Sequence, residues 1–465
     1  MKRTHVLRAC LALAGMMCAA TAFAATYEVN SIPDLQARIN SAVAGDVIIV
    51  QNGVYATSAS ITVNRQGTAT DPIRIVAKTV GGVEITGTHG FNVTSPAAHV
   101  EIAGFLFTHI SGRNQIRSGA THVRFTHNFF ECVGDGAYLT IAGHDAQVDR
   151  NEFRNKSTLG NMIDVRGSGS QIAQRVWIHH NYFHDLTSPG GNGAETIRFG
   201  LSGLSLSNGF GLIEHNLFER CVGENELISN KSSSNTYRYN TIVDSPGGEL
   251  TLRHGNDCLV YGNYFRNSAG MRIFGDRHQV FSNYLEATVG LNIGNGDGEV
   301  ADGAPLTSHD RPDDCVITFN TIVNSTRNYF MTGRTNGLGA TNIVFANNII
   351  QGGGAAAGLN GLYTGGVWGG NIIWETASAG AMPAGSYDVV DPLLEPKAKG
   401  VFRPQPGSPA IDSAGGDYPA VVFDLDGQPR TGLKDKGADE YSTDPDIAEF
   451  LTPGAILRLI HGGRP

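Results

Sequence analysis

The stretch VRFTHNFF at residues 123–130 alternates apolar and polar residues and then closes with an asparagine and an aromatic pair. Such alternation is typical of a strand that buries one face. Similar phrases recur along the chain, with the asparagine at Asn128, Asn151, Asn181, Asn216, Asn240, Asn263, Asn283, Asn320, Asn347 and Asn371. Successive asparagines are 20 to 37 residues apart, which suits one coil of a solenoid with or without an inserted loop.

These repeats predict an all-β chain that forms a right-handed parallel β-helix, because each coil can bury its apolar face only on the next coil. We interpret the repeated asparagine as structural, since asparagines stacked at one corner of each coil can hydrogen-bond in a ladder. The pattern at residues 31–44 predicts a short amphipathic helix that caps the open first coil.

The repeat fades after about residue 375, where proline and glycine become frequent. This change predicts an irregular C-terminal capping segment at residues 376–465, with a terminal helix at residues 447–460 that Pro453 and Gly454 would interrupt. The β-helix would then occupy residues 25–375 and hold the catalytic machinery. Residues 1–24 have the basic start, apolar run and A-x-A end of a secretory signal peptide, so we expect a secreted or periplasmic protein.

Charge and composition exclude several classes of protein. The 465 residues carry 34 basic and 43 acidic side chains, and loss of the first 24 residues would leave 31 basic ones. A formal charge of −12 disfavours a nucleic-acid binder, and the later apolar runs are too short for a membrane anchor. A disulfide among Cys132, Cys221, Cys258 and Cys315 is possible after export, but a chain of this length requires none.

Residues suited to chemistry gather between positions 191 and 278. Counting back from each repeated asparagine aligns the coils and brings Lys231, Arg253, His254 and Arg272 to nearly equivalent positions. Equivalent positions on adjacent coils stack about 4.8 Å apart, so these side chains should share one patch.

Two acidic residues of the same region, Glu224 and Glu226, should point to one face of a strand. Lys231 is an odd number of residues from Glu226, so a turn or bulge must intervene if both serve one site. The polar run at residues 230–235 could provide it. Spacing alone leaves two interpretations open, namely salt bridges on a solvated face or carboxylates that hold calcium.

Six phrases resemble polysaccharide lyase family 6, which comprises β-helical alginate lyases and chondroitinase B. They are NGAETIRFG (192–200), ENELISNKS (224–232), YRYNT (237–241), LTLRHGN (250–256), GNYF (262–265) and MRIFGDRH (271–278). The combination of NKS, an upstream E-x-E and LTLRHG one coil later is the most specific part. One departure is an apparent extra residue at Gly247-Gly248, which should change a loop tip.

The resemblance implies a role for each of these residues. It makes Lys231 the general base and Arg253 the general acid, and it makes Asn192, Glu224 and Glu226 the calcium ligands. It suggests that Glu195 orients Asn192 or contacts the substrate. It also suggests that Arg272 and His278 contact the carboxylates of the sugar, and that His254 supports the leaving-group side. The expected partner is an anionic uronate polysaccharide, and we expect a monomer.

The implied reaction is β-elimination, in which a base removes the C5 proton of a 4-O-linked uronate. Calcium would neutralise the sugar carboxylate, and nearby cations would favour the neutral form of Lys231. A guanidinium is effectively never deprotonated, so Arg253 could instead stabilise the leaving oxygen while water or His254 delivers the proton. We expect alginate as substrate, cut internally in mixed or mannuronate-containing blocks.

Three other functions remain open at this point. A chondroitin or dermatan sulfate lyase would use the same residues on another uronate polymer. A glycoside hydrolase would need two flanking carboxyl groups, one of them protonated, and would leave Lys231 and Arg253 without roles. A non-catalytic glycan-binding β-helix would instead show aromatic platforms.

Overall fold

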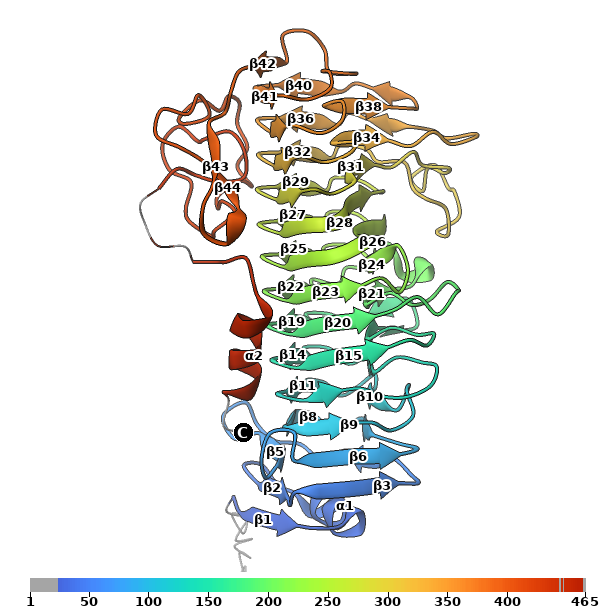
Figure 1. The fold of residues 1–465 in the computed structure, drawn as a ribbon. Helices are drawn as coiled ribbons and strands as arrows, with labels where there is room; N and C mark the ends of the chain where they lie inside the picture. Colours follow the sequence, from blue (N-terminus) through green and yellow to red (C-terminus); the bar gives the residue numbers. More distant parts are fainter. Residues whose placement is uncertain (1–23, 443–444, 446, 463–465) are drawn as a thin grey trace, which may run out of the picture.

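The computed structural model describes residues 24–442, 445 and 447–462. These residues form a parallel β-helix in which strands of successive coils stack into three ladders (Figure 1). The expected signal peptide lies at residues 1–24, of which 1–23 are outside the described residues. Among the described residues, no helix is long and apolar enough to cross a membrane.

The first ladder runs the length of the solenoid, and every neighbouring pair in it is parallel. Its strands are β1 (Thr26–Val29), β2 (Val47–Val50), β5 (Ile73–Ala77), β8 (Ala98–Ala103), β11 (Thr121–Thr126), β14 (Gln147–Asp149), β19 (Trp177–His179), β22 (Leu212–Glu214), β25 (Thr236–Arg238), β27 (Leu259–Tyr261), β29 (Gln279–Phe281), β32 (Val316–Thr318), β36 (Val344–Ala346) and β40 (Val367–Gly369).

The second ladder follows the repeated asparagine of each coil. Its strands are β3 (Gly53–Thr57), β6 (Val83–Gly87), β9 (Phe105–Phe107), β12 (Phe129–Phe130), β15 (Glu152–Lys156), β20 (Tyr182–Leu186), β23 (Leu217–Cys221), β26 (Thr241–His254), β28 (Tyr264–Ile273), β30 (Tyr284–Glu286), β33 (Thr321–Val323), β37 (Ile349–Gln351), β41 (Asn371–Trp374) and β42 (Tyr387–Val389). Because β42 pairs in parallel with β41, the ladder continues past residue 375, where we placed the end of the β-helix.

The third ladder completes each coil, and β26 and β28 are long enough to join it with their C-terminal halves. Its other strands are β4 (Ile61–Val63), β7 (Phe91–Val93), β10 (Asn114–Ile116), β13 (Leu139–Ile141), β16 (Ile163–Val165), β21 (Ile197–Gly200), β24 (Glu226–Lys231), β31 (Gly290–Ile293), β34 (Tyr329–Met331) and β38 (Ala357–Leu359). Short pairs form outside the ladders from β17 (Gly167–Ser168) with β18 (Gln171–Ile172), and from β35 (Ala340–Thr341) with β39 (Tyr363–Thr364). A 3-10 turn, η1 (Ser202–Leu204), follows β21.

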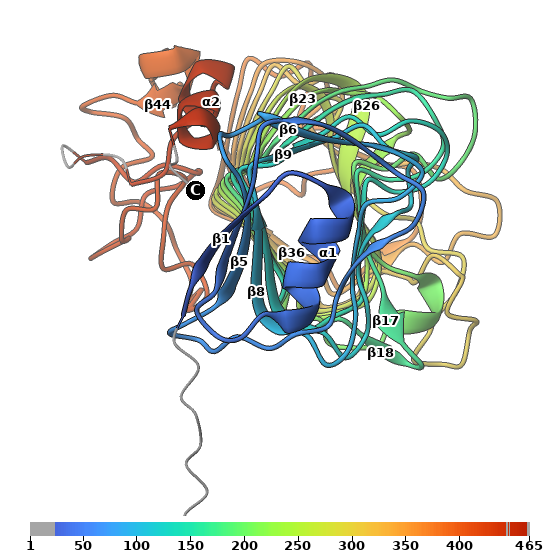
Figure 2. The same ribbon diagram turned by 90° about the horizontal axis from the view of Figure 1, so that it is seen from below.

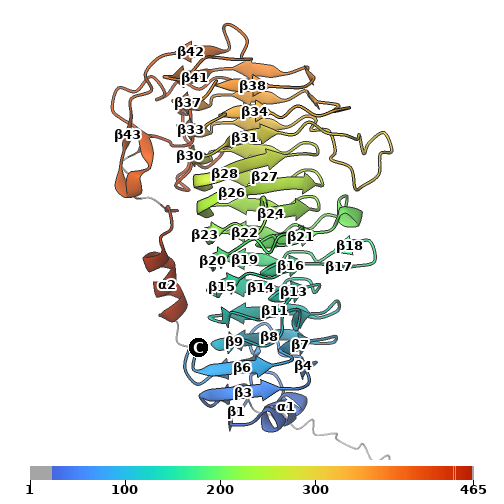
Figure 3. The ribbon, with the colours of Figure 1, turned by 45° about the vertical axis from the view of Figure 1, so that its right-hand side comes forward.

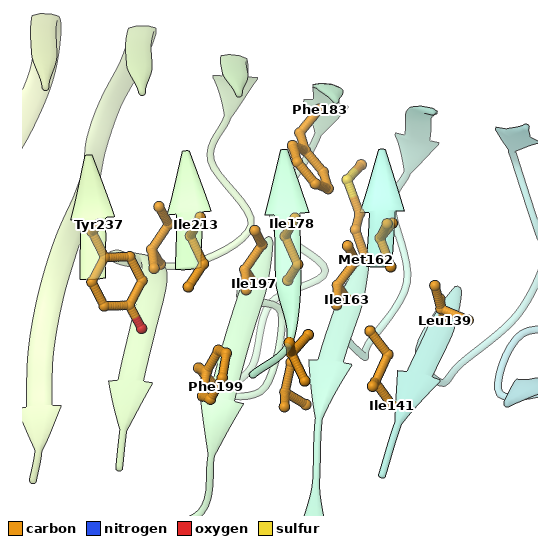
Figure 4. Close-up of a cluster of buried hydrophobic side chains, with 14 of the residues drawn as sticks. Leu139, Ile141, Met162, Ile163, Ile178, Phe183, Ile197, Phe199, Ile213 and Tyr237 are labelled. Carbon is orange, nitrogen blue, oxygen red and sulfur yellow. The ribbon is translucent and has the colours of Figure 1, made fainter. Parts of the chain in front are cut away.

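The core is a column of apolar side chains stacked coil upon coil. Ile163 of β16 lies in register with Ile197 of β21, and both side chains are fully buried. Figure 4 shows these residues among their neighbours from the facing ladder, such as Ile178 and Ile213. Identical residues stacked on adjacent coils bury the inner face of each strand, which is how the alternation in the sequence produces the solenoid.

The repeated asparagines form the expected ladder. From Asn151 on, each Oδ1 accepts the backbone N–H and the side-chain N–H of the asparagine one coil earlier, as Asn240 does from Asn216 at 3.1 and 3.0 Å, whereas Asn128 accepts the Phe105 N–H. The ladder consists of the buried residues Asn128, Asn151, Asn181, Asn216, Asn240, Asn263, Asn283, Asn320, Asn348 and Asn371. The structural interpretation is therefore confirmed.

One member of the predicted ladder is wrong, because Asn348 and not Asn347 takes the buried position. Asn347 adopts a φ of 54°, and its side chain donates to the carbonyl of Gly415. The residue before the ladder asparagine is left-handed in other coils too, as at His127 and Tyr239. Asparagine tolerates this left-handed conformation better than most residues, whereas a side chain branched at Cβ would be strained in it. Asn347 can therefore occupy the position before the ladder asparagine.

Substitution of Asn240 by alanine should destabilise the protein strongly. Its loss removes the acceptor of the Asn216 backbone N–H and the donor to the Ile213 carbonyl, which lies 2.9 Å away. Each buried group left unsatisfied costs about 1–3 kcal/mol. Urea unfolding should therefore show a free energy lower by at least about 2 kcal/mol, whereas Asn64→Ala at an exposed position should change it little. Equal stability of the two variants would contradict the role of the ladder.

Helix α1 (Ile32–Ser41) covers the open first coil, as expected (Figure 2). The Ser31 hydroxyl caps it by accepting the Asp34 N–H, and Leu35 and Ile39 are buried against the end of the core. The helix is shorter than the 31–44 pattern, because it ends at Ser41 and leaves Val43 in the following turn. The helix covers apolar side chains that would otherwise be exposed at the open end of the solenoid.

The C-terminal segment is irregular, and it lies along the flank of the solenoid (Figures 1 and 3). It contains η2 (Ala398–Gly400) and the antiparallel pair β43 (Leu394–Pro396) and β44 (Phe402–Pro404), and its buried residues such as Leu425 pack on outer side chains of the second ladder such as Tyr264. Helix α2 (Pro453–His461) begins at Pro453 rather than being interrupted by it. Proline suits the first position of a helix, where its missing N–H would have no partner.

Candidate active site

The outer face of the third ladder carries the polar residues of the expected site. Strands β16, β21, β24, β26 and β28 place one row of side chains in register, which consists of Asp164, Arg198, Ser229, Thr251 and Arg272. Lys231 and His254 also pair in the register of β24 with β26, as the alignment of coils predicted. Stacking therefore gathers on one face residues that are far apart in the sequence.

Two bulges set the directions of the charged side chains. Glu226 pairs with Glu249 and Ile228 with Leu250, so Leu227 is an extra residue in β24. The bulge lets Glu226 and Lys231 face the same side although their spacing is odd. A bulge was expected, but at residues 230–235 rather than at Leu227.

A second bulge lies in β26, where Asn230 pairs with Leu252 and Lys231 with His254, leaving Arg253 as the extra residue. Further back in β26, the register with β28 shifts between Ser245 and Glu249, and Gly247 there has a φ of 87°. A Cβ on Gly247 would meet nothing within 4 Å, but one on Gly248 would lie 2.9 Å from the Cys221 carbonyl oxygen. The extra residue that we expected at a loop tip therefore lies within the long strand β26.

Three carboxylates converge at one end of the site. Glu195, which precedes β21, meets Glu224 and Glu226, and one oxygen from each lies within 4.8 Å of the others. Glu224 accepts the backbone N–H of Gly193 at 2.8 Å, and Glu195 accepts the side-chain N–H of Asn161 at 2.7 Å. Burial, with Glu195 and Glu226 close by, raises the pKa of Glu224. The group is therefore short of positive charge around Glu224.

Lys231 extends from the end of β24 toward these carboxylates. Its Nζ lies 3.3 Å from Glu195 Oε1 and 4.0 Å from Glu226 Oε2. Its side chain is 17% exposed, so the amine is sheltered from bulk water but remains reachable. A lysine in this setting can take a proton from a molecule bound over the strand face.

Two arginines lie on the other side of Glu226. Arg253 Nε is 3.3 Å and Arg272 Nη2 is 2.8 Å from Glu226 Oε1, and Arg272 Nε is 3.0 Å from Glu249. Burial lowers the pKa of Arg253 and raises that of Glu249 to about 7. Arg253 Nη1 is buried and has no hydrogen-bond partner among the described residues, whereas the side chain as a whole is 18% exposed.

His254 is buried beside Lys231, and its Nε2 lies 3.0 Å from the Ser202 hydroxyl. Burial, together with Arg253 and Lys231, lowers the pKa of His254 to about 3. The imidazole is therefore neutral near pH 7. A neutral imidazole cannot serve as a proton-donating imidazolium, which disfavours His254 as the source of the leaving-group proton.

The prediction that His278 contacts the substrate is wrong. Its side chain is fully buried behind the strand face, where Nδ1 accepts the Cys258 N–H at 3.0 Å and Nε2 lies 2.9 Å from the Phe274 carbonyl. Both ring nitrogens are thus used to hold the turn after β28. The phrase MRIFGDRH placed His278 near Arg272 in sequence, but the turn directs its side chain inward.

The structure also changes which residues are placed to bind a metal ion. Glu195, expected to orient Asn192 or to contact substrate, is itself in the carboxylate cluster and is 1% exposed in its side chain. Asn192 lies on the exposed loop before Gly193, next to the backbone that binds Glu224. The structure brings Lys231, Arg253, Arg272, Glu224 and Glu226 together as predicted.

The sequence reasoning missed several residues of the site. Ser229, whose hydroxyl donates to Glu226 at 2.6 Å, occupies the alternate position between Glu226 and Lys231. A cleft of about 240 Å³ also continues from Arg272, with His309 and Arg334 among its lining residues. These two residues lie 3.0 Å apart and come from segments outside the resembling phrases, so only the alignment of later coils could have indicated them.

The carboxylate cluster fits a hard divalent cation. It offers only oxygen atoms, which calcium prefers, and separations within 4.8 Å are compatible with Ca–O bonds of about 2.3–2.6 Å. The raised pKa of Glu224 reflects a carboxylate that would gain from added positive charge. Glu195, Glu224 and Glu226 would hold such an ion, with Asn192 close by in the chain.

The four cysteines of the described residues, Cys132, Cys221, Cys258 and Cys315, are free and buried. Each lies at an inner position of the solenoid, and burial raises the pKa of Cys221 to about 12. They therefore pack as small apolar residues and leave the charged site as the part of the molecule suited to chemistry.

Comparison with known proteins agrees with this geometry. A family model described as chondroitinase B matches residues 29–349. The PL6 family alginate lyase AlyGC superposes with a TM-score of 0.74 at 25% identity, over 86% of this chain and 60% of that one. The chain thus spans less than two thirds of the length of AlyGC.

Two further structures are similar. A mannuronic acid specific polysaccharide family 6 lyase from human gut microbiota gives a TM-score of 0.67 at 25% identity, over 75% of this chain and 86% of that one. A PL6 alginate lyase in complex with a trisaccharide gives 0.66 at 19% identity, over 83% and 92%, and shares the fold. No curated protein matches the chain in sequence. The match of the family model over most of the chain shows that it belongs to the chondroitinase B family, polysaccharide lyase family 6.

Proposed function

We propose that the chain is a secreted or periplasmic lyase that cleaves alginate by calcium-assisted β-elimination. The observation that carries this proposal is the placement of Lys231, Arg253 and Arg272 around the carboxylate cluster, with Glu226 in contact with all three, on one sheltered strand face. A hydrolase would need two carboxyl groups on opposite sides of the scissile bond and would give Lys231 and Arg253 no role.

In the proposed reaction, Lys231 holds the position of the general base. Its neutral amine takes the C5 proton, and the electron pair left on C5 forms the C4–C5 double bond as the bond from C4 to O4 breaks. A cation held by Glu195, Glu224 and Glu226 would neutralise the sugar carboxylate and stabilise the negative charge that develops there. Lys231 Nζ lies 3.3 Å from Glu195 and 4.0 Å from Glu226, and a cation on these carboxylates would favour the neutral form of the amine beside the sugar carboxylate.

Arg253 acts on the leaving O4. Its guanidinium, part of an 18% exposed side chain, can donate a hydrogen bond to the oxygen as negative charge accumulates on it. The proton itself comes from water, because guanidinium is effectively never deprotonated and His254 is neutral. Arg272 and Arg334 flank the cleft that continues from the site, where they can bind carboxylates of neighbouring sugars.

Incubation with polyuronates should raise ultraviolet absorbance, because only elimination creates an unsaturated uronate. Alginate with mixed or mannuronate-containing blocks should react fastest, and fragments of several sizes should appear early if cleavage is internal. The mannuronic acid specificity stated for one similar lyase supports this choice of block. New reducing ends without the absorbance change would instead identify a hydrolase, and neither signal would identify a glycan-binding protein.

A second candidate, a chondroitin or dermatan sulfate lyase, is favoured by the description of the matching family model. The same residues would serve, since both polymers present a uronate carboxylate next to the C5 proton. Parallel assays on alginate fractions and dermatan sulfate distinguish the two. Faster release of unsaturated product from dermatan sulfate than from every alginate fraction would overturn the proposed substrate.

The mature enzyme would begin after a signal peptide that is cleaved behind Ala24. It would be a monomer, made of the β-helix and the C-terminal closing segment. Amino-terminal sequencing of the exported protein should begin at Ala25, and light scattering should give the mass of one chain.

A further inference from the structure

The longest interval between ladder asparagines, from Asn283 to Asn320, contains a loop at residues 294–313 between β31 and β32. The loop projects from the flank opposite the C-terminal segment (Figures 1 and 3). It carries His309 and Asp297, which contact Arg334 at 3.0 and 2.6 Å. His309 also packs on the Phe274 ring, so the loop forms one wall of the cleft beside Arg272.

A second carboxylate cluster lies at the base of this loop, apart from the one in the active site. Asp276 comes from the turn after β28, and Glu299 and Asp310 come from the loop. One oxygen from each lies within 4.8 Å of the others. The three residues are only 7%, 9% and 4% exposed, so the cluster is buried rather than spread on a solvated surface.

The arginines near this cluster do not neutralise all of its carboxylates, because each is also paired with another acidic residue. Arg311 pairs with Glu299 at 3.0 Å, but it is shared with Asp313, which accepts its Nη2 at 2.9 Å. Arg277 comes only within 3.5 Å of Asp276 because it is already bound to Asp257 at 2.8 and 2.9 Å.

Asp276 is the least satisfied member. Its Oδ1 is buried and has no hydrogen-bond partner among the described residues. Burial and the carboxylates of Asp310 and Glu299 raise the pKa of Asp276 to about 7. A buried carboxylate oxygen without a partner is costly, and a cation that neutralises it would remove this cost.

We propose that Asp276, Glu299 and Asp310 bind a calcium ion that fixes the loop at residues 294–313 against the solenoid. The donors are all carboxylate oxygens and lie within 4.8 Å of one another, close enough for one cation to draw all three to it. Backbone carbonyls or water would complete the six to eight ligands that calcium takes. The Val300 N–H donates to Asp310 at 2.7 Å, which holds the backbone of the loop beside the three carboxylates.

The ion would act on the cleft through the loop rather than on the reacting atoms. Asp276 belongs to the solenoid and the other two ligands belong to the loop, so bound calcium would connect the loop to the solenoid. His309 and Asp297 would then stay in contact with Arg334. This inference does not depend on the proposed activity, because the site and its metal can be tested without substrate.

The test is the number of calcium ions bound per chain, measured by equilibrium dialysis and elemental analysis on the metal-free protein titrated with calcium alone. The variants are Asp276→Asn, Glu224→Gln and the double variant, and Asp302→Asn at an exposed position of the same loop is the control. We expect two ions for wild type and for the control, one for each single variant and none for the double variant.

Hydrogen exchange in the Glu224→Gln background gives a second readout at the loop itself. Calcium should slow exchange of backbone N–H groups at residues 294–313, and Asp276→Asn should remove this effect. The proposal is overturned if folded Asp276→Asn protein binds as much calcium as the control. Wild type with one ion that only Asp276→Asn removes would instead support this site and contradict calcium in the active site.

Discussion

Replacement of Lys231 by alanine should lower kcat/KM on alginate by about 10²–10⁴-fold, the loss typical of removing one general base. The fold should survive because the side chain lies on the outer face of β24 and contributes nothing to the apolar core. Circular dichroism and calcium content should therefore match wild type. Lys78→Ala, at an exposed salt bridge with Glu28 far along the solenoid, is the matched control and should retain full activity.

The arginine variant separates the role of the proton from the role of the charge. Alanine at position 231 also leaves the buried Glu195 without its partner 3.3 Å away, so part of its effect could come from that carboxylate. Lys231→Arg keeps a positive charge beside Glu195 but cannot accept a proton from C5. It should be as inactive as the alanine variant. Near-normal turnover would mean that the position supplies charge alone, and the neutral His254 would become the first alternative base.

Removal of calcium should abolish most activity. Without a cation near Glu224, the sugar carboxylate stays negative and the charge developing on C5 and its carboxylate loses its main stabilisation. Loss of one preorganised electrostatic partner typically costs about 10²–10³-fold in kcat, which sets the minimum expected here. Calcium should restore activity better than magnesium, since magnesium requires tighter octahedral geometry. Initial rates after chelation and add-back measure both effects.

Two variants assign the effect of chelation to one of the two carboxylate clusters. Glu224→Gln should be nearly inactive and insensitive to added calcium. Asp276→Asn should keep the chemical step, so its rate at saturating substrate should depend on calcium as in wild type. Full activity after exhaustive chelation, with no metal left by elemental analysis, would remove calcium from the mechanism and leave Glu195 and Glu226 as partners of Lys231 and the arginines.

Much of the fold could be predicted because one physical constraint repeats in every coil. Ten coils combine alternating apolar residues with a buried asparagine, so the sequence carries the pattern ten times. The error within the ladder, Asn347 for Asn348, arose where two adjacent asparagines fit the phrase and only the left-handed backbone of Asn347 distinguishes them. The position of the C-terminal segment along the flank depends on long-range contacts such as Leu425 with Tyr264, which leave no periodic signal.

The charged site was predictable for a related reason. Alignment on the asparagines gives the register of the coils, and register places Lys231 opposite His254. What failed was local backbone geometry. The bulge at Leu227 and the turn that directs His278 inward are set by hydrogen bonds that no spacing rule contains. The cleft wall formed by His309 depends on how a long loop folds back, which a repeat pattern does not determine.

The mass of the products on alginate tests the central claim, that this site eliminates rather than hydrolyses, most directly. Elimination breaks the bond between C4 and O4 without adding water, so the masses of the fragments should sum to the mass of the parent oligosaccharide. Every fragment with a new non-reducing end should carry one C4–C5 double bond, and Lys231→Arg should yield almost none of it. Fragments whose masses include an added water molecule, formed at the wild-type rate, would contradict the account.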